Sequence, residues 1–189
     1  PYGLSEELKA AKEAEIPVIA YDDLIMNTDA LKYYVTFGGR QIGQLIGQEI
    51  IDKEELEKLQ EAKESKTIEF FMGSLDDEQA LFFYNGLMEK LQPYLDDGTL
   101  VCKSGQITFE ETGILRWSMD EAQSRAEETL SEFYSDTETP DIICTGFDGA
   151  AEGVLKALRN DGLTLGENWP MITGVGCDAD AGRNIAESE

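Results

Sequence analysis

The chain has 189 residues, 41% of them hydrophobic and 9% aromatic, which is enough apolar side chain for a core and excludes a disordered chain. Its 39 acidic and 15 basic residues give a net charge of -24, which argues against partners such as nucleic acid or an anionic membrane surface. The absence of histidine excludes Ser-His-Asp and Cys-His catalysis, and the sequence predicts neither a bound metal nor a cofactor.

The first 37 residues predict a short amphipathic helix over 5–15, a strand over 16–21 and a second strand over 32–37. One helix and two strands are too few to bury a sheet. We therefore expect residues 1–37 to be the remnant of a first lobe, with strands that lack partners and that could pair between copies of the chain.

From Gly39 onward, helices and strands alternate. A long helix with apolar residues at helical spacing starts there and is expected to fray within 53–65. Further strands are predicted over 67–72, 97–104, 141–146 and 169–176, and further helices over 76–95, 118–134 and 148–162. This alternation predicts an α/β fold, a doubly wound parallel sheet with helices on both faces. Residues 38–176 would form a second lobe, with 177–189 following it.

Cys102, Cys144 and Cys177 are widely spaced and include no C-x-x-C pair. Each lies in or beside an apolar run, so we expect buried free thiols rather than a zinc site; one disulfide with a thiol left over is the alternative. No run of about 18 apolar residues is present, so no membrane span is predicted.

Carboxylates recur where the predicted strands end. Asp22, Asp76, Asp148 and Asp178 each follow a strand, and Trp117 lies in another loop at the same edge of the sheet. Carboxylates accept hydrogen bonds from neighbouring hydroxyls, and an indole offers an apolar face to a pyranose ring, so this set suits a sugar. The alternative for any single aspartate is that it caps the following helix.

Enzymatic sites find little support. The segment GVGCDA lacks the third glycine of a dinucleotide-binding turn, and no Walker A lysine motif or calcium-loop spacing is present. A pair of glycosidase carboxylates cannot be recognised without a distance between them. We therefore expect a binding protein and not an enzyme.

Several motifs in order resemble one family. IPVIAYDDLI, YYVTF, GSLDDEQALFFYNGLMEKLQPYLDDG, ILRWSMDEAQ, TGFDGAAEG and TGVGCDAD are similar to segments of sugar-binding proteins of bacterial ABC importers, in particular the multiple-monosaccharide and xylose-binding branch. The resemblance implies a type I periplasmic-binding fold, in which two α/β lobes joined by three crossing strands close on one sugar. In that fold the strand over 32–37 would be the first crossing, and 177–189 would be a truncated return segment toward the first lobe.

The same resemblance implies which residues bind the sugar. They are Asp22, Asp23, Glu78, Gln79, Trp117, Phe147, Asp148 and Asp178, with Trp117 as the stacking residue. Asp23 stands where the family normally has arginine, which replaces a bidentate donor by an acceptor. Gly38 and Gly39 stand where Asp-Asn is common. These departures predict an altered sugar or weaker binding.

The function that follows is an extracytoplasmic substrate-binding component of a monosaccharide ABC importer. It would bind an aldose in an interlobe cleft by carboxylate and amide hydrogen bonds and by tryptophan stacking, and deliver it to a membrane permease. We expect it in the periplasm, or at the cell surface as a lipoprotein in a Gram-positive host. The alternative is the effector-binding core of a LacI-type transcription regulator, although the sequence contains no basic DNA-binding segment.

Overall fold

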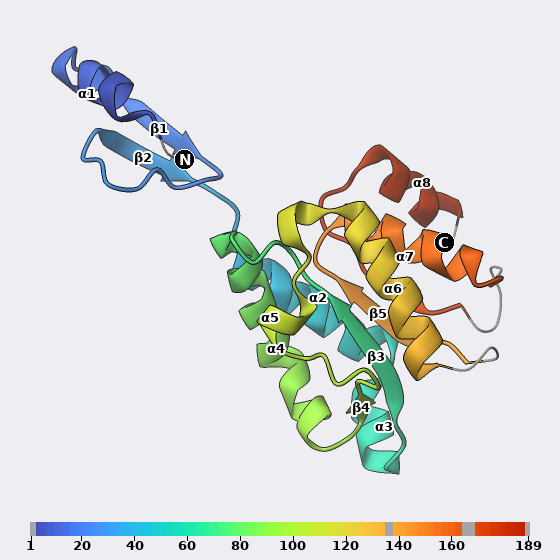
Figure 1. The fold of residues 1–189 in the computed structure, drawn as a ribbon. Helices are drawn as coiled ribbons and strands as arrows, with labels where there is room; N and C mark the ends of the chain where they lie inside the picture. Colours follow the sequence, from blue (N-terminus) through green and yellow to red (C-terminus); the bar gives the residue numbers. More distant parts are fainter. Residues whose placement is uncertain (1–2, 135–137, 164–168, 188–189) are drawn as a thin grey trace. The chain divides into compact units, whose positions relative to one another are not determined.

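The computed structural model describes residues 3–134, 138–163 and 169–187 of the chain. The polypeptide divides into two compact units, Pro1–Gly38 (unit 1) and Gly39–Glu189 (unit 2), shown in Figure 1. Whether unit 1 belongs to a larger lobe stays a prediction, and the last two residues of the predicted return segment, 188–189, lie outside the described part. Within the described ranges, no helix is long and apolar enough to cross a membrane.

Unit 1 consists of helix α1 (Ser5–Glu13) and a two-stranded parallel sheet formed by β1 (Val18–Tyr21) and β2 (Leu31–Val35). Both strands are shorter than predicted. Within this unit Leu8 and Ala20 are buried, but the strands also expose large apolar side chains, Ile19 at 59%, Tyr21 at 68% and Tyr33 at 58%. Unit 1 therefore has a sheet surface that its own residues leave open to solvent.

Unit 2 is built on a four-stranded parallel sheet, as predicted. Its strands are β3 (Lys66–Phe71), β4 (Leu100–Val101), β5 (Ile142–Thr145) and β6 (Met171–Ile172), in the order β4-β3-β5-β6. The last residues of the two central strands, Phe71 and Thr145, are direct partners. All four strands point the same way, so the loops that follow them open at one edge of the sheet.

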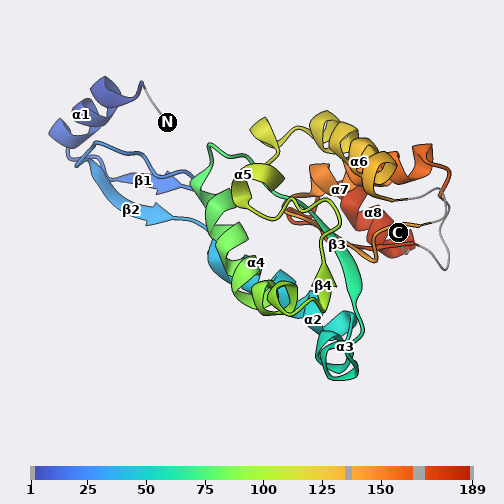
Figure 2. The ribbon, with the colours of Figure 1, turned by 60° about the horizontal axis from the view of Figure 1, so that its bottom comes forward.

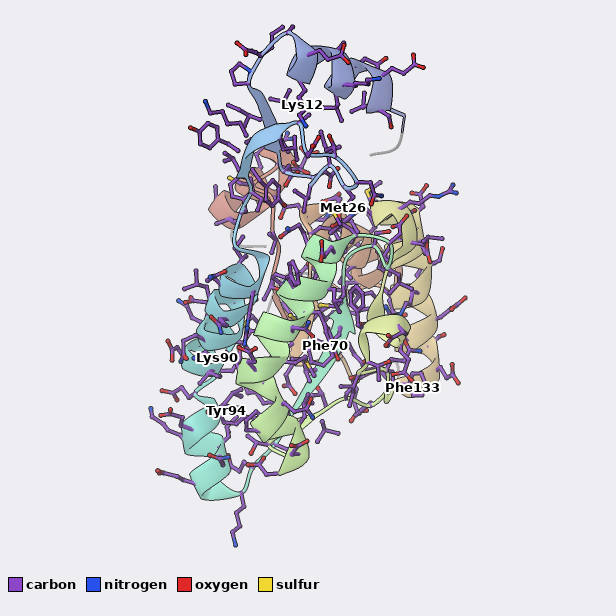
Figure 3. The ribbon with its side chains drawn as sticks, turned by 90° about the vertical axis from the view of Figure 1, so that its left-hand side faces the viewer. Lys12, Met26, Phe70, Lys90, Tyr94 and Phe133 are labelled. Atoms are coloured by element: carbon purple, nitrogen blue, oxygen red, sulfur yellow. The ribbon has the colours of Figure 1, made fainter. Side chains whose placement is uncertain are left out.

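Helices cover both faces of this sheet (Figure 2). On one face, α2 (Gly39–Lys53), α3 (Leu56–Ala62) and α4 (Glu78–Asp96) pack against Phe70 of β3 (Figure 3). On the other face, α6 (Met119–Phe133) and α7 (Asp148–Asn160) pack against Phe71. Neighbouring strand residues face opposite sides, so β3 contributes to both cores and is buried throughout its centre. The predicted α/β class is confirmed.

Helices α2 and α4 are in backbone contact through glycine. A Cβ atom on Gly43 would lie 2.0 Å from the carbonyl oxygen of Phe83, and one on Gly86 would lie 2.0 Å from the carbonyl oxygen of Arg40. No real Cβ fits at either distance. The glycine of each helix therefore allows the backbone of the other helix to pack directly against it.

The helix predicted to fray within 53–65 does not fray, and this expectation is wrong. The chain turns at Glu55, which has a φ of 51°, and continues as α3, whose Leu56 is fully buried. Burial of Leu56 in the core stabilises a short second helix, which the charged sequence of this segment does not predict. Leu45, one of the apolar residues at helical spacing in α2, is 68% exposed.

Two predicted strands are much shorter in the structure. Within the predicted range 97–104 only the two residues of β4 pair with a neighbouring strand, and within 169–176 only the two residues of β6 do. The sequence also predicted nothing between β4 and α6, where the structure has α5 (Phe109–Thr112) and a 3-10 turn, η1 (Leu115–Trp117). After β6 comes α8 (Ala179–Glu187). The cysteines are all free, and Cys144 is buried as predicted. Cys102 is only partly buried and Cys177 is exposed, so the expectation of burial is wrong for Cys177.

Candidate functional site

The carboxyl edge of the unit 2 sheet brings together the loops after β3 and β5. The amide of Gly146 donates to the carbonyl of Phe71 at 2.8 Å, and a Cβ on Gly146 would lie 3.1 Å from the nitrogen of Gly73. The two loops therefore run in contact, and the side chains that follow them share one surface, which we call the carboxyl edge.

Trp117 lies at this edge, at the end of η1, and 38% of its surface is exposed. Its ring passes over Gly73, where a Cβ would lie 2.3 Å from the indole Cη2. Its edge meets Phe147, with ring centroids 5.2 Å apart and an interplanar angle of 86°. These two aromatic rings form a partly exposed apolar corner that can hold the C–H face of a sugar ring.

The backbone that carries Trp117 is in an unusual conformation. Arg116 and Trp117 have φ values of 56° and 55°, in the left-handed region of backbone conformation that residues other than glycine rarely adopt. The amide of Arg116 donates to the hydroxyl of Ser74 at 2.7 Å. Ser74 is buried and was not among the predicted site residues, although it follows the β3 strand in GSLDDEQ.

The loop after β3 leads into α4 through two aspartates with local roles. Asp77 is the N-cap of α4 and accepts from the amide of Gln79 at 2.8 Å, while Asp76 accepts from Ser74. The capping alternative thus holds for Asp77. Glu78 is exposed in the first turn of α4. Gln79 is half-buried, with its side-chain oxygen beside Gly39 at the start of α2.

Asp148 is buried at the start of α7, and its carboxylate faces the loop after β6. Its Oδ2 accepts from the amide of Asp178 at 2.7 Å, and its own amide donates to the carbonyl of Val175 at 2.9 Å. Gly174 and Gly176 lie against the same carboxylate, leaving no room for a side chain. Asp178 is exposed, and both aspartates line a groove of about 420 Å³.

Asp22 and Asp23 belong to unit 1 and follow β1 directly. Both side chains are exposed. The amide of Asp22 donates to the carbonyl of Val35 at 2.8 Å, and its carbonyl accepts from the hydroxyl of Tyr34 at 2.8 Å. Asp22 has a φ of 66°, so the chain turns sharply where β1 ends. Their part in a site stays a prediction.

The structure thus brings Trp117 into contact with Phe147 and Asp148 into contact with Asp178, all at one edge of unit 2. Among the residues that the structure describes, no cluster of cysteine and carboxylate side chains could hold a metal ion. Hydroxyl and backbone groups around carboxylates, beside an aromatic corner, are the groups that bind a neutral polyhydroxylated ligand.

Comparisons with known proteins point the same way. All of residues 1–189 match the family described as periplasmic binding protein domain. The chain is 39% identical over 187 residues to a multiple sugar-binding periplasmic receptor, ChvE, of Rhizobium radiobacter, covering 98% of this chain and 52% of that protein. It is 36% identical to a multiple sugar-binding periplasmic protein, SbpA, of Azospirillum brasilense, with 98% and 51% covered.

A solved structure is also similar. It is an ABC transporter solute binding protein from Clostridium phytofermentans with bound beta-D-glucose, 39% identical, with a TM-score of 0.84, covering 98% of this chain and 55% of that one. The chain spans about half the length of the curated relatives it matches. The match over every residue, at this identity, leaves one conclusion: the chain belongs to the periplasmic binding protein domain family.

Proposed function

We propose that this chain is part of an extracytoplasmic binding component of a monosaccharide ABC importer, which binds an aldose and is not an enzyme. The observation that carries the proposal is the partly exposed corner of Trp117 and Phe147, at the same edge of the sheet as the exposed side chain of Asp178. One side of a pyranose is apolar and its rim carries hydroxyls, so this pairing of an aromatic face with an acceptor matches its chemistry.

The relatives add support for this class of ligand. Two are named as multiple sugar-binding proteins, and the similar solved structure holds beta-D-glucose. These names favour transport over the transcription-regulator alternative. They also support an extracytoplasmic location, because both curated relatives are named periplasmic. We extend this to delivery of the sugar to a membrane permease, and to lipid anchoring where the host has no outer membrane.

Each predicted residue has a role in this proposal, and that of Phe147 is to complete the apolar corner with Trp117. Trp117 stacks on the sugar, Asp178 accepts from hydroxyls, and Glu78 and Gln79 at the start of α4 provide further polar contacts. Asp148 contributes mainly through the loop it holds, since its Oδ2 already bonds to the amide of Asp178. Asp22 and Asp23 of unit 1 are proposed as further acceptors, with Asp23 altering the preference among sugars.

The test is a calorimetric titration of the full-length protein with D-glucose, D-galactose, D-xylose, L-arabinose and D-ribose. We expect saturable binding of at least one aldose. Trp117→Ala should weaken that binding, and Trp169→Phe is the matched control because Trp169 packs in the core of unit 2. Absence of saturable binding for all five sugars would overturn the proposal.

A further inference from the structure

The segment that carries Trp117 is held to the sheet by buried polar groups. This segment, residues 102–118, joins β4 to α6 and contains α5 and η1. Its apolar anchors are few, the buried side chains of Phe109 and Ile114, and polar contacts add to them. A left-handed pair such as Arg116 and Trp117 persists only where its surroundings hold it.

One attachment is Arg125 of α6. Its Nη1 donates to the carbonyl of Thr112 at 2.8 Å, and its Nη2 donates to the carbonyl of Phe70 at 3.0 Å. Nε and Nη2 also donate to the side-chain oxygen of Gln106, at 3.0 Å and 2.7 Å. The guanidinium lies 4.8 Å from the ring centre of Phe71. Figure 3 labels Phe70 on β3 and Phe133 at the end of α6, the two elements that Arg125 joins.

Glu69 gives the same segment a second attachment. It is 2% exposed, and it accepts from the hydroxyl and amide of Ser104 and from the hydroxyl of Tyr134 at 2.9 Å. Burial lowers the pKa of Arg125, and the negative charge of Glu69 opposes that lowering. The segment is therefore held near its start by the buried carboxylate of Glu69 and near its middle by the guanidinium of Arg125.

The Arg125 contact is transmitted to the Trp117 ring through backbone hydrogen bonds. The carbonyl of Thr112 that accepts from Arg125 also accepts from the amide of Met72 at 2.8 Å. Next along the chain, the amide of Ile114 donates to the carbonyl of Gly73 at 3.2 Å. Gly73 is the residue under the indole. Loss of the Arg125 fork would leave Thr112 bonded to Met72 alone at this carbonyl, and the turn that carries Trp117 would be held less tightly.

We propose that Arg125 is a positioning residue for sugar binding: it does not contact the ligand, but it fixes the Trp117 segment so that the indole is presented at the carboxyl edge. The inference rests on the proposed function for its affinity readout. The position of the indole can be measured without any sugar. Only a guanidinium can serve here, because one side chain donates to three acceptors: the carbonyls of Thr112 and Phe70 and the side-chain oxygen of Gln106.

The experiment uses the full-length protein labelled with 5-fluorotryptophan, in which the Trp117 fluorine resonance is assigned by its loss in Trp117→Phe. Arg125→Lys keeps the charge and removes the fork, and Gln106→Met removes an acceptor from the other side. Arg159→Lys, at an exposed position near the end of α7, is the matched control.

We expect the Trp117 resonance to move and broaden in Arg125→Lys and Gln106→Met, with sugar affinity weaker by about threefold to tenfold, the share that one aromatic contact supplies. The Trp169 resonance and the control variant should be unchanged. An unmoved Trp117 resonance and unchanged affinity, in variants that are folded but less stable, would show that Arg125 is only structural. If the parent protein binds no sugar, the proposed function fails, and the resonance alone still decides whether Arg125 positions the indole.

Discussion

The carboxylate of Asp148 is bonded to the backbone of Asp178, the residue whose own carboxylate is exposed at the same edge. Oδ2 of Asp148 lies 2.7 Å from the amide nitrogen of Asp178, and Asp148 is 7% exposed. Two aspartates that look equivalent in the sequence therefore have different roles. One fixes the loop after β6, and the other faces solvent.

Separate substitutions should divide these roles. Asp148→Ala leaves the partly buried amide of Asp178 without its acceptor, so we expect the free energy of unfolding to fall by about 1–3 kcal/mol. Asp178→Ala removes an exposed side chain, so its stability should change by less than about 0.5 kcal/mol, while sugar affinity falls by roughly tenfold or more. Urea unfolding and calorimetric titration of both variants measure the two effects. Equal losses of stability in the two variants would contradict this division.

Gly73→Ala should displace the indole of Trp117. The new methyl group would lie 2.3 Å from Cη2 of the ring and 2.8 Å from the Cβ of Ala80. We expect a stability loss of about 1–3 kcal/mol and weaker sugar binding. In a Trp117→Leu background the same substitution should add little further loss of affinity. A full additional loss in that background would show that the effect does not pass through the ring.

The thiols should differ in reactivity. Cys177 is exposed, whereas Cys144 is buried and burial raises its pKa to about 12. Burial also raises the pKa of Cys102 to about 11. Because the thiolate is the reactive form, we expect Cys177 to react first with a chromogenic disulfide reagent at neutral pH. Cys177→Ser should remove the fast phase, and urea should expose the slower thiols. A fast phase that persists in Cys177→Ser would refute this order.

Alkaline pH should destabilise unit 2. A thiol with an ordinary pKa of 9.0 that rises to about 12 on folding binds its proton more tightly in the folded state. The thiol's contribution to the free energy of unfolding is complete below pH 9. It is lost as the pH rises toward 12, by about 1.4 kcal/mol per pH unit for each such group. Burial and Glu69 raise the pKa of Tyr134 as well, so it adds to the effect. Cys144→Ala should make the decline of unfolding free energy between pH 9 and 11 shallower; an unchanged slope would count against this.

Unit 1 should promote self-association of the 189-residue chain. Ile19, Tyr21 and Tyr33 are more than half exposed on its small parallel sheet, and strands with free edges and apolar faces pair readily. We expect light scattering to show a concentration-dependent mass, reduced by Ile19→Lys. Leu45→Lys, which adds the same charge at an exposed apolar position on α2, is the control. A constant monomer mass up to high concentration would contradict the prediction.

The sheet of unit 2 and the helices on its faces could be predicted because their signals are local. Runs such as TIEFFM and DIICTG are apolar and short, and Ser118 caps α6 by accepting from the amide of Glu121, as its position before an acidic turn indicates. Once the strands are parallel, the loops that carry Trp117 and Phe147 are expected at one edge. Topology therefore predicts that the two loops share an edge, whereas the contact between the two rings depends on the unpredicted η1 turn.

The parts that escaped prediction depend on distant residues. Glu55 and Arg116 adopt left-handed φ without glycine, so no local signal marks those turns. Arg116 is held by Ser74, far away in sequence, and α3 exists because Leu56 enters the core. The bond from Asp178 to Asp148 likewise requires the loop after β6 to return to the start of α7. Residue patterns alone contain no information on such closures.

The reciprocal glycines of α2 and α4 also affect how sequence variation in this protein should be interpreted. At Gly43 and Gly86 any side chain would strike the carbonyl of the opposite helix. A saturation scan scored by sugar uptake would therefore find both positions as intolerant as Trp117, although neither contributes a functional group. Intolerance to substitution will not by itself map the ligand site, and uptake must be scored together with the amount of folded protein.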